Sequence, residues 1–339
     1  MTSTAHHGPR NGPVAVAYVT DANYHEMTLF ALASVALAHG APVDFFLFQH
    51  GYQSEVPPRF RQAVESRGHG LAVAPAPGYA PANEVTIGKH LTSTTYLRVA
   101  VIEQLARHYA YIAYLDGDTL AFGDLHLEHI VGFEESAAAC LDLSVSTGFD
   151  DPAFALNCNR NGVSPDFFNA GVMVINGAKW LRTRALDRFT RNLFAHSHAC
   201  AYMSECVPND QCALNLTFGG DCRMLPVRYN VQKSALHTKA WSTALVRHYT
   251  GRVKFMPMRS WRCDRREYAL LRRISAETAL PLPAGTFDYG VSYFLNAIRR
   301  HRTVRRYETA IGVIENRLAT PASRPTPLPQ GRMETEPWP

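Results

Sequence analysis

The first part of the chain alternates short apolar runs with longer apolar or amphipathic segments. Residues 14–19, 43–48 and 71–74 are apolar runs of strand length, and the first of them ends in the polar turn 20–23. Residues 27–38 and 58–67 have the length and composition of helices, and each stops near a glycine, Gly40 or Gly68. Strands that alternate with helices predict a parallel sheet with helices on both faces.

The alternation continues through the middle of the chain. Ser93 or Thr94 can cap a helix that runs to about residue 107, and the strand predicted at 109–115 is almost wholly apolar. Further buried strands are predicted at 137–141 and 171–175, helices at 178–196 and 210–216, and a loop at 144–165. We therefore expect an α/β fold with a largely parallel sheet.

The chain changes character after Pro257. An apolar stripe at steps of three and four predicts an amphipathic helix, formed by Val304, Tyr307, Ile311, Ile314 and Leu318. The net charge of +5 is concentrated in the same region, where five arginines fall close together at Arg299, Arg300, Arg302, Arg305 and Arg306. Two interpretations are open: the helix packs against the rest of the protein, or it lies on an anionic membrane surface.

This change in character sets the boundaries that we expect. Residues 1–12 form a flexible N-terminus, 13–258 the main domain, 259–320 a small basic helical extension, and 321–339 a Pro-rich disordered tail. The longest strongly apolar stretch, 29–38, is far shorter than the ~20 residues of a membrane-spanning helix. The polar start of the chain has no secretory pattern, so we expect a cytoplasmic protein.

Seven cysteines are scattered along the chain. Their number is odd, and a chain of this length can be stable without disulfide bonds. Cys200, Cys206 and Cys212 follow one another closely enough to suggest a soft-metal site. They lack the paired C-x-x-C spacing of zinc sites. We therefore expect ordinary thiols rather than a zinc centre.

The strongest chemical signal is the triplet Asp116, Gly117, Asp118, which directly follows the strand predicted at 109–115. In open α/β sheets ligands bind at the carboxyl ends of the strands. Two carboxylates there can both bind a hard divalent cation, and a glycine between them leaves room for a diphosphate. The competing interpretation is a plain turn, because aspartate and glycine also favour turns.

Several segments of the chain, in order, resemble glycosyltransferase family 8, which includes bacterial lipopolysaccharide galactosyl- and glucosyltransferases and the glycogenins. The most specific is YLDGDTLAFGDL at 114–125, which is similar to the DxD metal motif of that family. The others are TDANY at 20–24, TTYLRV at 94–99, FFNAGVMVIN at 167–176, NDQCALN at 209–215 and HYTGRVKF at 248–255. The resemblance implies a single Rossmann-like nucleotide-sugar-binding domain of the GT-A type, with a mixed, mostly parallel sheet, as the catalytic domain over residues 13–258.

The resemblance also implies a metal site and a binding site for a UDP-sugar. Asp116, Asp118 and His248 would bind Mn²⁺ or Mg²⁺, and two carboxylates with an imidazole suit Mn²⁺. The remaining nucleotide-sugar contacts that it implies come from Asp21, Asn23, Tyr24, Arg98, Gly117, Gly251 and Lys254. Taken singly, His248 could be a buried structural histidine, Arg98 a surface charge, and Asp21 and Asn23 helix caps. The family usually has Pro-Trp after the lysine, whereas this chain has Phe255 and Met256.

Around the transferred sugar the resemblance places Asp142, Asn169, Ala170, Gly171, Asp210 and Gln211, of which Asp142, Asp210 and Gln211 are the candidate catalytic residues. Carboxylates and amides suit sugar hydroxyls, although each could also end a strand or cap a helix. Enzymes of this family retain the anomeric configuration. An amide is a poor nucleophile and no carboxylate nucleophile is obvious, so we expect same-face transfer rather than a covalent intermediate.

The implied activity is metal-dependent hexosyl transfer, of galactose or glucose, to a carbohydrate or glycolipid acceptor, as in lipopolysaccharide biosynthesis. We expect no nucleic-acid partner and possible contact of the basic extension with the inner membrane surface. Two alternatives stay open. Asp116 and Asp118 also resemble the nucleophile motif of haloacid-dehalogenase-type phosphatases, with Asp150 and Asp151 as the later acidic pair. The chain could also be a catalytically silent sugar-nucleotide-binding protein.

Overall fold

The computed structural model of this protein describes residues 12, 14–79, 94–148, 151–198, 200–203, 206, 210–257, 263–284 and 290–319. The expected Pro-rich tail at 321–339 and all but residue 12 of the expected N-terminal segment lie outside these residues. No helix in the described part of the chain is both long enough and apolar enough to cross a membrane.

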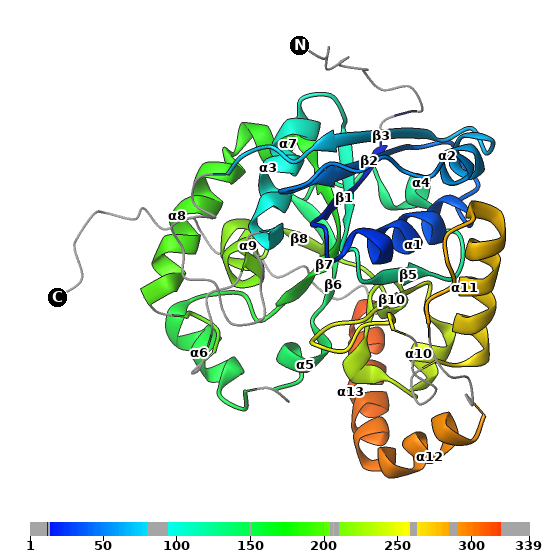
Figure 1. Ribbon diagram of the computed structural model, residues 1–339. Coiled ribbons are helices and arrows are strands. Elements are labelled where there is room, and N and C mark those ends of the chain that lie inside the picture. Colours follow the sequence, from blue (N-terminus) through cyan, green and yellow to red (C-terminus); the bar gives the residue numbers. More distant parts are fainter. Residues whose placement is uncertain are drawn as a thin grey trace.

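A seven-stranded sheet forms the centre of the described structure, with strand order β3-β2-β1-β4-β7-β6-β8 (Figure 1). Its strands are β1 (Val14–Thr20), β2 (Asp44–Gln49), β3 (Gly70–Pro75), β4 (Tyr111–Leu115), β6 (Ala137–Leu141), β7 (Phe168–Asn176) and β8 (Cys222–Met224). Neighbours run parallel except at β7, which is antiparallel to both β4 and β6. The predicted mixed, mostly parallel sheet is confirmed.

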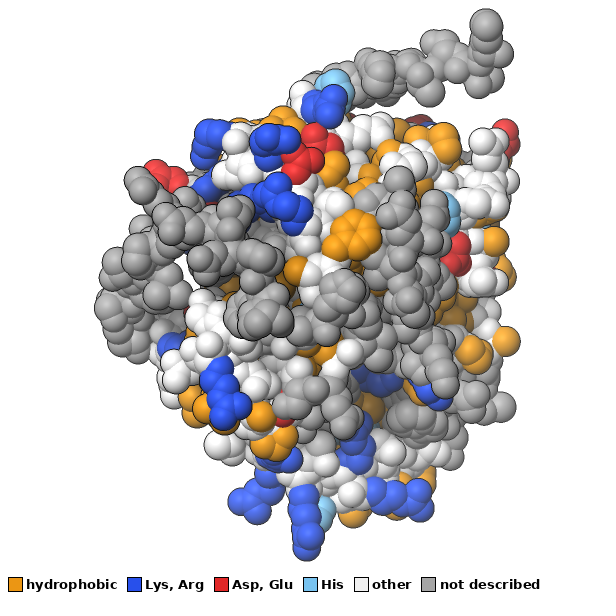
Figure 2. All heavy atoms as spheres, turned by 90° about the vertical axis from the view of Figure 1, so that its left-hand side faces the viewer, with side chains coloured by type: hydrophobic (Ala, Val, Ile, Leu, Met, Phe, Trp, Pro, Cys, Tyr) orange, Lys and Arg blue, Asp and Glu red, His pale blue; other side chains and the backbone are white. Residues whose placement is uncertain are grey.

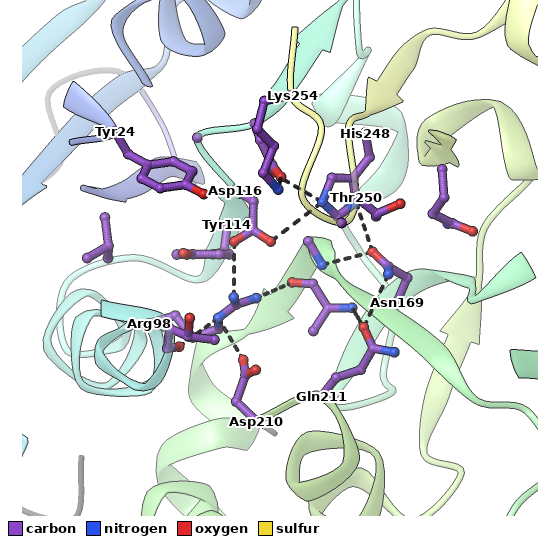
Figure 3. A pocket seen from close by; sticks show the side chains of 18 of the residues that line it. Tyr24, Arg98, Tyr114, Asp116, Asn169, Asp210, Gln211, His248, Thr250 and Lys254 are labelled. Carbon is purple, nitrogen blue, oxygen red and sulfur yellow. Dashed lines mark hydrogen bonds and ion pairs between the residues drawn. The ribbon is translucent and has the colours of Figure 1, made fainter. Parts of the chain in front are cut away.

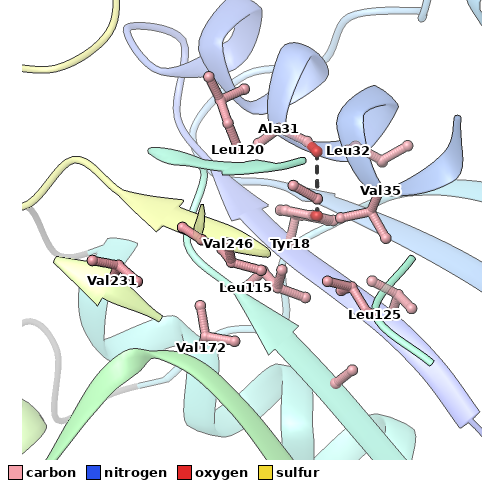
Figure 4. Packing of buried hydrophobic residues seen from close by; sticks show 14 of the residues in the cluster. Tyr18, Ala31, Leu32, Val35, Leu115, Leu120, Leu125, Val172, Val231 and Val246 are labelled. Atoms are coloured by element: carbon pink, nitrogen blue, oxygen red, sulfur yellow. Dashed lines mark hydrogen bonds between the residues drawn. The ribbon is translucent and has the colours of Figure 1, made fainter. Parts of the chain in front are cut away.

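Helices cover both faces of this sheet because every residue of β1 is buried and its side chains alternate between the faces. Val16 and Tyr18 lie in the core that contains the helices α1 (His25–Ala36), α2 (Pro58–Glu65) and α11 (Arg265–Thr278). Figure 4 shows this packing, in which the Tyr18 hydroxyl donates to the carbonyl oxygen of Ala31 (3.5 Å). Ala15 and Ala17 face the opposite core, formed with α3 (Thr94–Ala106), α7 (Gly177–Arg182), α8 (Ala185–His198) and α9 (Asp210–Phe218).

A small second sheet, which the sequence did not predict, lies beside the end of β4. It has the order β5-β10-β9 and consists of β5 (Thr119–Ala121), β9 (Val231–Gln232) and β10 (Val246–His248). Strands of two or three residues are too short for a hydrophobic period to reveal. The pairing of His248 with Thr119 brings His248 next to the Asp-Gly-Asp turn, more than a hundred residues earlier in the chain.

Two of the predicted segments differ in the structure. The helix expected at 178–196 is two helices, α7 and α8, because the chain breaks at Arg184, which has a left-handed backbone (φ 51°). The loop expected at 144–165 contains two short helices, α5 (Leu143–Ser146) and α6 (Phe154–Asn161). Further short elements are α4 (Leu127–Ile130), α10 (Lys239–Thr243) and the 3₁₀ turns Val227–Tyr229 and Lys233–Ala235.

The basic C-terminal segment contains α12 (Val291–Arg299) and α13 (His301–Ala319). The apolar stripe of α13 packs inward, with Tyr307, Ile311 and Ile314 each buried in the main core. Polar contacts fix the same face, since Ser144 Oγ and the Tyr307 hydroxyl lie 2.9 Å apart and Glu315 accepts a hydrogen bond from the backbone N–H of Val227. Of the two interpretations of this stripe, packing against the protein is the one that the structure shows.

Candidate functional site

A cleft of about 420 Å³ opens at one edge of the central sheet, beyond the carboxyl ends of β1 and β4 (Figure 3). Because β7 runs antiparallel to β4, the first residues of β7 lie at this same edge. The cleft is lined by nearly all of the residues predicted from the sequence: Asp21, Tyr24, Arg98, Asp116, Gly117, Asp118, Asp142, Asn169, Ala170, Gly171, Asp210, Gln211, His248, Gly251 and Lys254. Asn23, the remaining predicted residue, is exposed and is not part of this lining.

Asp116, Asp118 and His248 converge on one point of the cleft. Nε2 of His248 lies 3.2 Å from Oδ1 of Asp118 and 3.7 Å from Oδ2 of Asp116. One ligand atom from each of the three residues lies within 4.8 Å of the other two. Two carboxylates and one imidazole are a donor set that fits a hard or borderline divalent cation such as Mn²⁺.

Lys254 forms an ion pair with Asp118 at the same place. Burial by itself would raise the pKa of the Asp118 carboxyl, but the charges of His248 and Lys254 outweigh it and hold that pKa far below its usual range. Lys254 also donates to the carbonyl oxygen of Tyr249 (3.1 Å), which fixes the direction of its side chain. The cleft thus holds a cationic side chain beside the carboxylate of Asp118, where it can also interact with an anionic ligand.

Arg98 is buried beneath the cleft and bridges two of its carboxylates. Its Nη2 lies 3.1 Å from Asp116 and its Nε lies 2.9 Å from Asp210. The Nε proton is directed at the carbonyl oxygen of Thr95, so the contact with Asp210 is ionic rather than hydrogen bonded. Burial raises the pKa of Asp210 to about 6, against the opposing effect of Arg98. Arg98 is therefore an internal counter-ion and not a surface charge.

A hydrogen-bonded group of polar side chains forms the floor of the cleft. Nε2 of Gln211 donates to Oδ2 of Asp142 (3.0 Å), and Oε1 of Gln211 accepts from the backbone N–H of Ala170 (3.1 Å). Nδ2 of Asn169 donates to the same Asp142 oxygen (3.0 Å) and to Gln211 (3.2 Å). The other oxygen of Asp142 caps α5, so its position is doubly fixed. These side chains present a rigid array of donors and acceptors, as recognition of hydroxyl groups requires.

Two glycines are required for close approach around Asp116, Asp118 and His248. A Cβ at Gly117 would lie 2.2 Å from Oγ1 of Thr28, and one at Gly171 would lie 2.1 Å from Cε1 of His248. Neither separation is tolerated between non-bonded heavy atoms, so each glycine allows a packed neighbour to reach the cleft. Gly171 in particular leaves the space that the His248 ring occupies.

The turn after β1 lies at the entrance of the cleft. Oδ1 of Asp21 accepts from the backbone N–H groups of Asn23 and Tyr24, at 2.9 and 3.1 Å, so Asp21 shapes the start of α1 as well as lining the cleft. The Tyr24 side chain is partly exposed and extends over the opening (Figure 3). An aromatic ring in this position offers a stacking surface to a planar ligand.

Asn230, Gln232 and Thr250 were not predicted from the sequence. Gln232 and Thr250 line the cleft, and Asn230 is fully buried behind His248, with its Oδ1 3.1 Å from Nδ1 of the imidazole. Asn230 and Gln232 lie on a short irregular stretch around β9, where no hydrophobic period or motif marks them. Thr250 stands inside the segment that resembles family 8, next to Gly251, so its position could have been inferred from that segment.

Comparison with known proteins agrees with this geometry. Residues 15–256 match the family model described as Glycosyl transferase family 8. No curated protein matches the chain. Among solved structures, the galactosyltransferase LgtC in complex with donor and acceptor sugar analogues has 21% identity and a TM-score of 0.55, over 78% of this chain and 95% of LgtC.

Two other solved structures have the same fold. The bifunctional glycosyltransferase WbbM has 18% identity and a TM-score of 0.56 over 78% of this chain, which spans only half of WbbM. GlyE from Streptococcus pneumoniae TIGR4 has 19% identity and a TM-score of 0.51, over 80% of this chain and 66% of GlyE. At these identities the likeness establishes the shared fold.

Proposed function

Because the chain belongs to glycosyl transferase family 8, we propose that it is a retaining, metal-assisted hexosyltransferase that moves galactose or glucose from a UDP-sugar to a hydroxyl of a carbohydrate or glycolipid acceptor. The observation that carries this proposal is the convergence of Asp116, Asp118 and His248 beside Lys254 in one cleft. A nucleotide-sugar diphosphate is a ligand whose negative charge a divalent cation and an ammonium group neutralise together.

Asp116, Asp118 and His248 are the proposed ligands of Mn²⁺ or Mg²⁺. When bound, a divalent cation supplies charge neutralisation for the diphosphate of the donor and for the UDP that departs. Lys254 adds a second positive charge that interacts with the same diphosphate. The pairing of Lys254 with Asp118 in the absence of donor holds this ammonium group in place until the diphosphate arrives.

The nucleoside and the sugar are assigned to opposite ends of the cleft. Tyr24 and Asp21 line the entrance after β1, where we place the uracil and the ribose; Asn23 remains a proposed contact at this rim. Asp142, Asn169 and Gln211 form the polar floor, where we place the hydroxyls of the transferred hexose. LgtC has an active-site glutamine too.

The rigid setting of Gln211 favours same-face transfer. Both ends of its amide are already hydrogen bonded to the protein, so the amide is held still and cannot rotate freely to attack a sugar. Asp210 lines the cleft and is paired with Arg98, and an ionised carboxylate there stabilises positive charge on the sugar ring. In this mechanism the acceptor hydroxyl forms the new bond on the face that UDP leaves, and its proton passes to the departing diphosphate.

A screen of nucleotide sugars tests the proposed activity. The purified protein is incubated with each donor, with Mn²⁺ and without it, and release of the nucleoside diphosphate is measured with and without sugar acceptors. We expect Mn²⁺-dependent release from a UDP-hexose and from no other class of donor. Binding of UDP-hexose without any release, with water or with acceptor, would instead identify a silent binding protein.

The same material tests the stereochemistry and the phosphatase alternative. NMR of the product is expected to show the anomeric configuration of the donor, and an inverted product would overturn the proposed mechanism. Mass spectrometry of a rapidly quenched reaction is expected to show no glycosyl adduct on Asp210 or Gln211. The phosphatase alternative requires hydrolysis of a simple phosphomonoester; its motif would normally end the first strand of the sheet, whereas Asp116 follows β4.

The domain division proposed from the sequence fits this function. Residues 13–258 carry every proposed contact with the donor, and 259–320 form an extension whose helices α11 and α13 pack back on the same core. Helix α11 of the extension packs beside α1 and α2. There Arg59 donates to the carbonyl oxygen of Ala276, and Arg67 pairs with Glu277.

Contact with an anionic membrane surface, if the acceptor is a glycolipid, is assigned to α12 rather than to the buried stripe of α13. Phe294 is 63% exposed and Val291, Leu295 and Ile298 are exposed beside it. Figure 2 shows Lys and Arg side chains together with apolar ones at the end of the molecule where Figure 1 places α12 and α13. An exposed apolar helix beside arginines is the pattern of a peripheral membrane contact.

Vesicle flotation tests this assignment. The full-length protein is expected to float with anionic vesicles and not with neutral ones, and a double variant Phe294→Asp, Ile298→Asp is expected to lose binding. Val313→Asp is the matched control, because Val313 is equally exposed but lies on α13. Equal flotation of all three proteins, or none with anionic vesicles, would remove the membrane contact.

A further inference from the structure

A second group of His and Cys side chains, residue types that bind metals, lies outside the cleft. It consists of His196 near the end of α8, Cys200 and Cys206 after that helix, and Cys212 on α9. One ligand atom from each of the four lies within 4.8 Å of all the others. The spacing of these residues has no paired C-x-x-C, which is why the sequence alone favoured ordinary thiols. In the folded protein these four side chains lie together, although they are separated along the sequence.

The distances within this group are those of a tetrahedral site. The Sγ atoms of Cys206 and Cys212 are 3.9 Å apart, and Cys206 Sγ is 3.4 Å from Nε2 of His196. Zinc–sulfur bonds of about 2.3 Å and zinc–nitrogen bonds of about 2.0 Å in tetrahedral geometry place their ligand atoms about 3.5 to 3.8 Å apart. The group therefore needs little rearrangement to enclose one ion.

The surroundings of Cys200 match those of a metal-bound thiolate. Its Sγ accepts hydrogen bonds from the backbone N–H groups of Tyr202 (3.4 Å) and Met203 (3.3 Å). Such donors stabilise negative charge on sulfur and are a recurring outer layer around metal ligands. The segment is also anchored from α6, because Asn157 and Asn161 donate to the carbonyl oxygens of Tyr202 and Ala201.

We propose that His196, Cys200, Cys206 and Cys212 bind one zinc ion, which has a structural role distinct from the metal in the cleft. Three thiolates and an imidazole select zinc over the hard cations that Asp116 and Asp118 suit. A closed set of four protein ligands leaves no open position, so the ion takes no part in catalysis.

The position of this site gives the ion a specific task. Cys212 directly follows Asp210 and Gln211, the residues at the start of α9 that line the cleft. An ion held between Cys212 and His196 joins the end of α8 to the start of α9. The zinc ion thereby fixes the first turn of α9, and with it the positions of Asp210 and Gln211.

The metal content of the purified full-length protein tests this proposal independently of any activity. The protein is produced with zinc in the medium, purified without chelator under reducing conditions, and analysed by inductively coupled plasma mass spectrometry. We expect about one zinc ion per chain, as for a four-ligand structural site. Replacement by Co²⁺ is expected to give sulfur-to-cobalt charge-transfer absorption and the visible bands of a tetrahedral complex.

Variants separate this site from the cleft. Cys206→Ser and Cys212→Ser are expected to lose the zinc, whereas Cys222→Ser on β8 and Asp118→Asn in the cleft keep it. Cys206 is only partly buried, so its variant remains informative if Cys212→Ser does not fold. Unaltered, reduced protein that neither contains zinc nor takes it up would overturn the proposal. Zinc that persists in Cys206→Ser but is lost in Asp118→Asn, or a Cys206–Cys212 disulfide in the isolated protein, would overturn it as well.

Discussion

The amide oxygen of Asn169 lies 3.0 Å from Nδ1 of His248. The same oxygen accepts a hydrogen bond from the backbone N–H of Gly171, which identifies it as the oxygen of the amide. An oxygen can only accept, so Nδ1 of His248 must carry the proton. In the neutral imidazole, the form that binds a cation, the lone pair is then on Nε2, the nitrogen that faces Asp116 and Asp118. In the proposed metal site, Asn169 thus prepares His248 to bind the cation, as outer-layer partners do.

This relationship predicts the effect of Asn169→Ala on metal affinity. The variant removes the acceptor that fixes the His248 tautomer, so the concentration of Mn²⁺ needed for half-maximal donor hydrolysis is expected to rise by about 10- to 100-fold. Asn192→Ala is the control, because the Asn192 amide donates to Thr217, near the end of α9 opposite to Asp210 and Gln211. An unchanged Mn²⁺ requirement in Asn169→Ala would show that the hydrogen bond has no part in metal binding.

A second prediction concerns Asp118, which contacts both His248 and Lys254. Asp118→Asn removes one proposed metal ligand and the charge that positions Lys254, so the rate of transfer is expected to fall by at least about 100-fold. A strong chelator is expected to abolish the activity of the unaltered protein, and added Mn²⁺ to restore it. Asp187→Asn, on the exposed surface of α8, is the matched control. Full activity in the presence of the chelator contradicts the assignment of a catalytic metal.

A third prediction uses a pair of glycines. Gly171→Ala places a methyl group against the His248 ring, and we expect it to lower the free energy of unfolding by about 1–3 kcal/mol and to abolish metal-dependent activity. Gly312→Ala places the same methyl group in open space on α13, where it is expected to stabilise the protein by about 0.5–1 kcal/mol. Denaturant unfolding and donor hydrolysis measure the two effects. Equal stability of the two variants would mean that His248 moves aside freely.

The core of the fold could be predicted from the hydrophobic pattern, because long buried strands and helices leave a clear period in the sequence. Residues 137–141 were predicted to form a strand, and β6 has those same bounds. Elements that depend on single backbone conformations escaped prediction: the break at Arg184 between α7 and α8 is set by one left-handed residue. The three strands of the second sheet are short and are held by pairing with distant partners, so no local period marks them.

The candidate site divides in the same way. Asp116 and Asp118 were predicted because a buried strand delivers them to the ligand-binding edge of the sheet. His248 was found only through the resemblance to family 8, since one histidine in a short strand carries no signal of its own. Asn230 was not predicted because it contacts His248 from behind the imidazole, and no sequence motif marks such a supporting residue. Cys206 and Cys212 were interpreted as ordinary thiols because they lack the paired C-x-x-C spacing of zinc sites. Their contact in the folded protein cannot be read from that spacing.

A last prediction concerns the pH dependence of stability. Asp124 accepts hydrogen bonds from the backbone N–H groups of Gly40 (2.9 Å) and His126 (2.8 Å) and contacts Nδ1 of the buried His39 (2.6 Å). Partial burial would raise the pKa of Asp124, but these hydrogen bonds outweigh it and lower that pKa below its usual value. The folded protein therefore binds this proton more weakly than the unfolded chain does. The stabilisation is present above the unfolded pKa, about 4, and is lost as the pH falls through the folded value.

Asp124→Asn resembles the protonated carboxyl in shape but has no charge at any pH. Hydrogen bonds to a charged group contribute about 1.5–3 kcal/mol, so we expect the variant to be less stable than the unaltered protein by an amount of this order at pH 7. The difference is expected to shrink as the pH falls below about 4, because the unaltered protein then also loses the charge. Urea unfolding at a series of pH values measures it, with Asp187→Asn as the exposed control. A difference that stays constant down to acid pH would show that Asn is tolerated poorly for its shape and not for its missing charge.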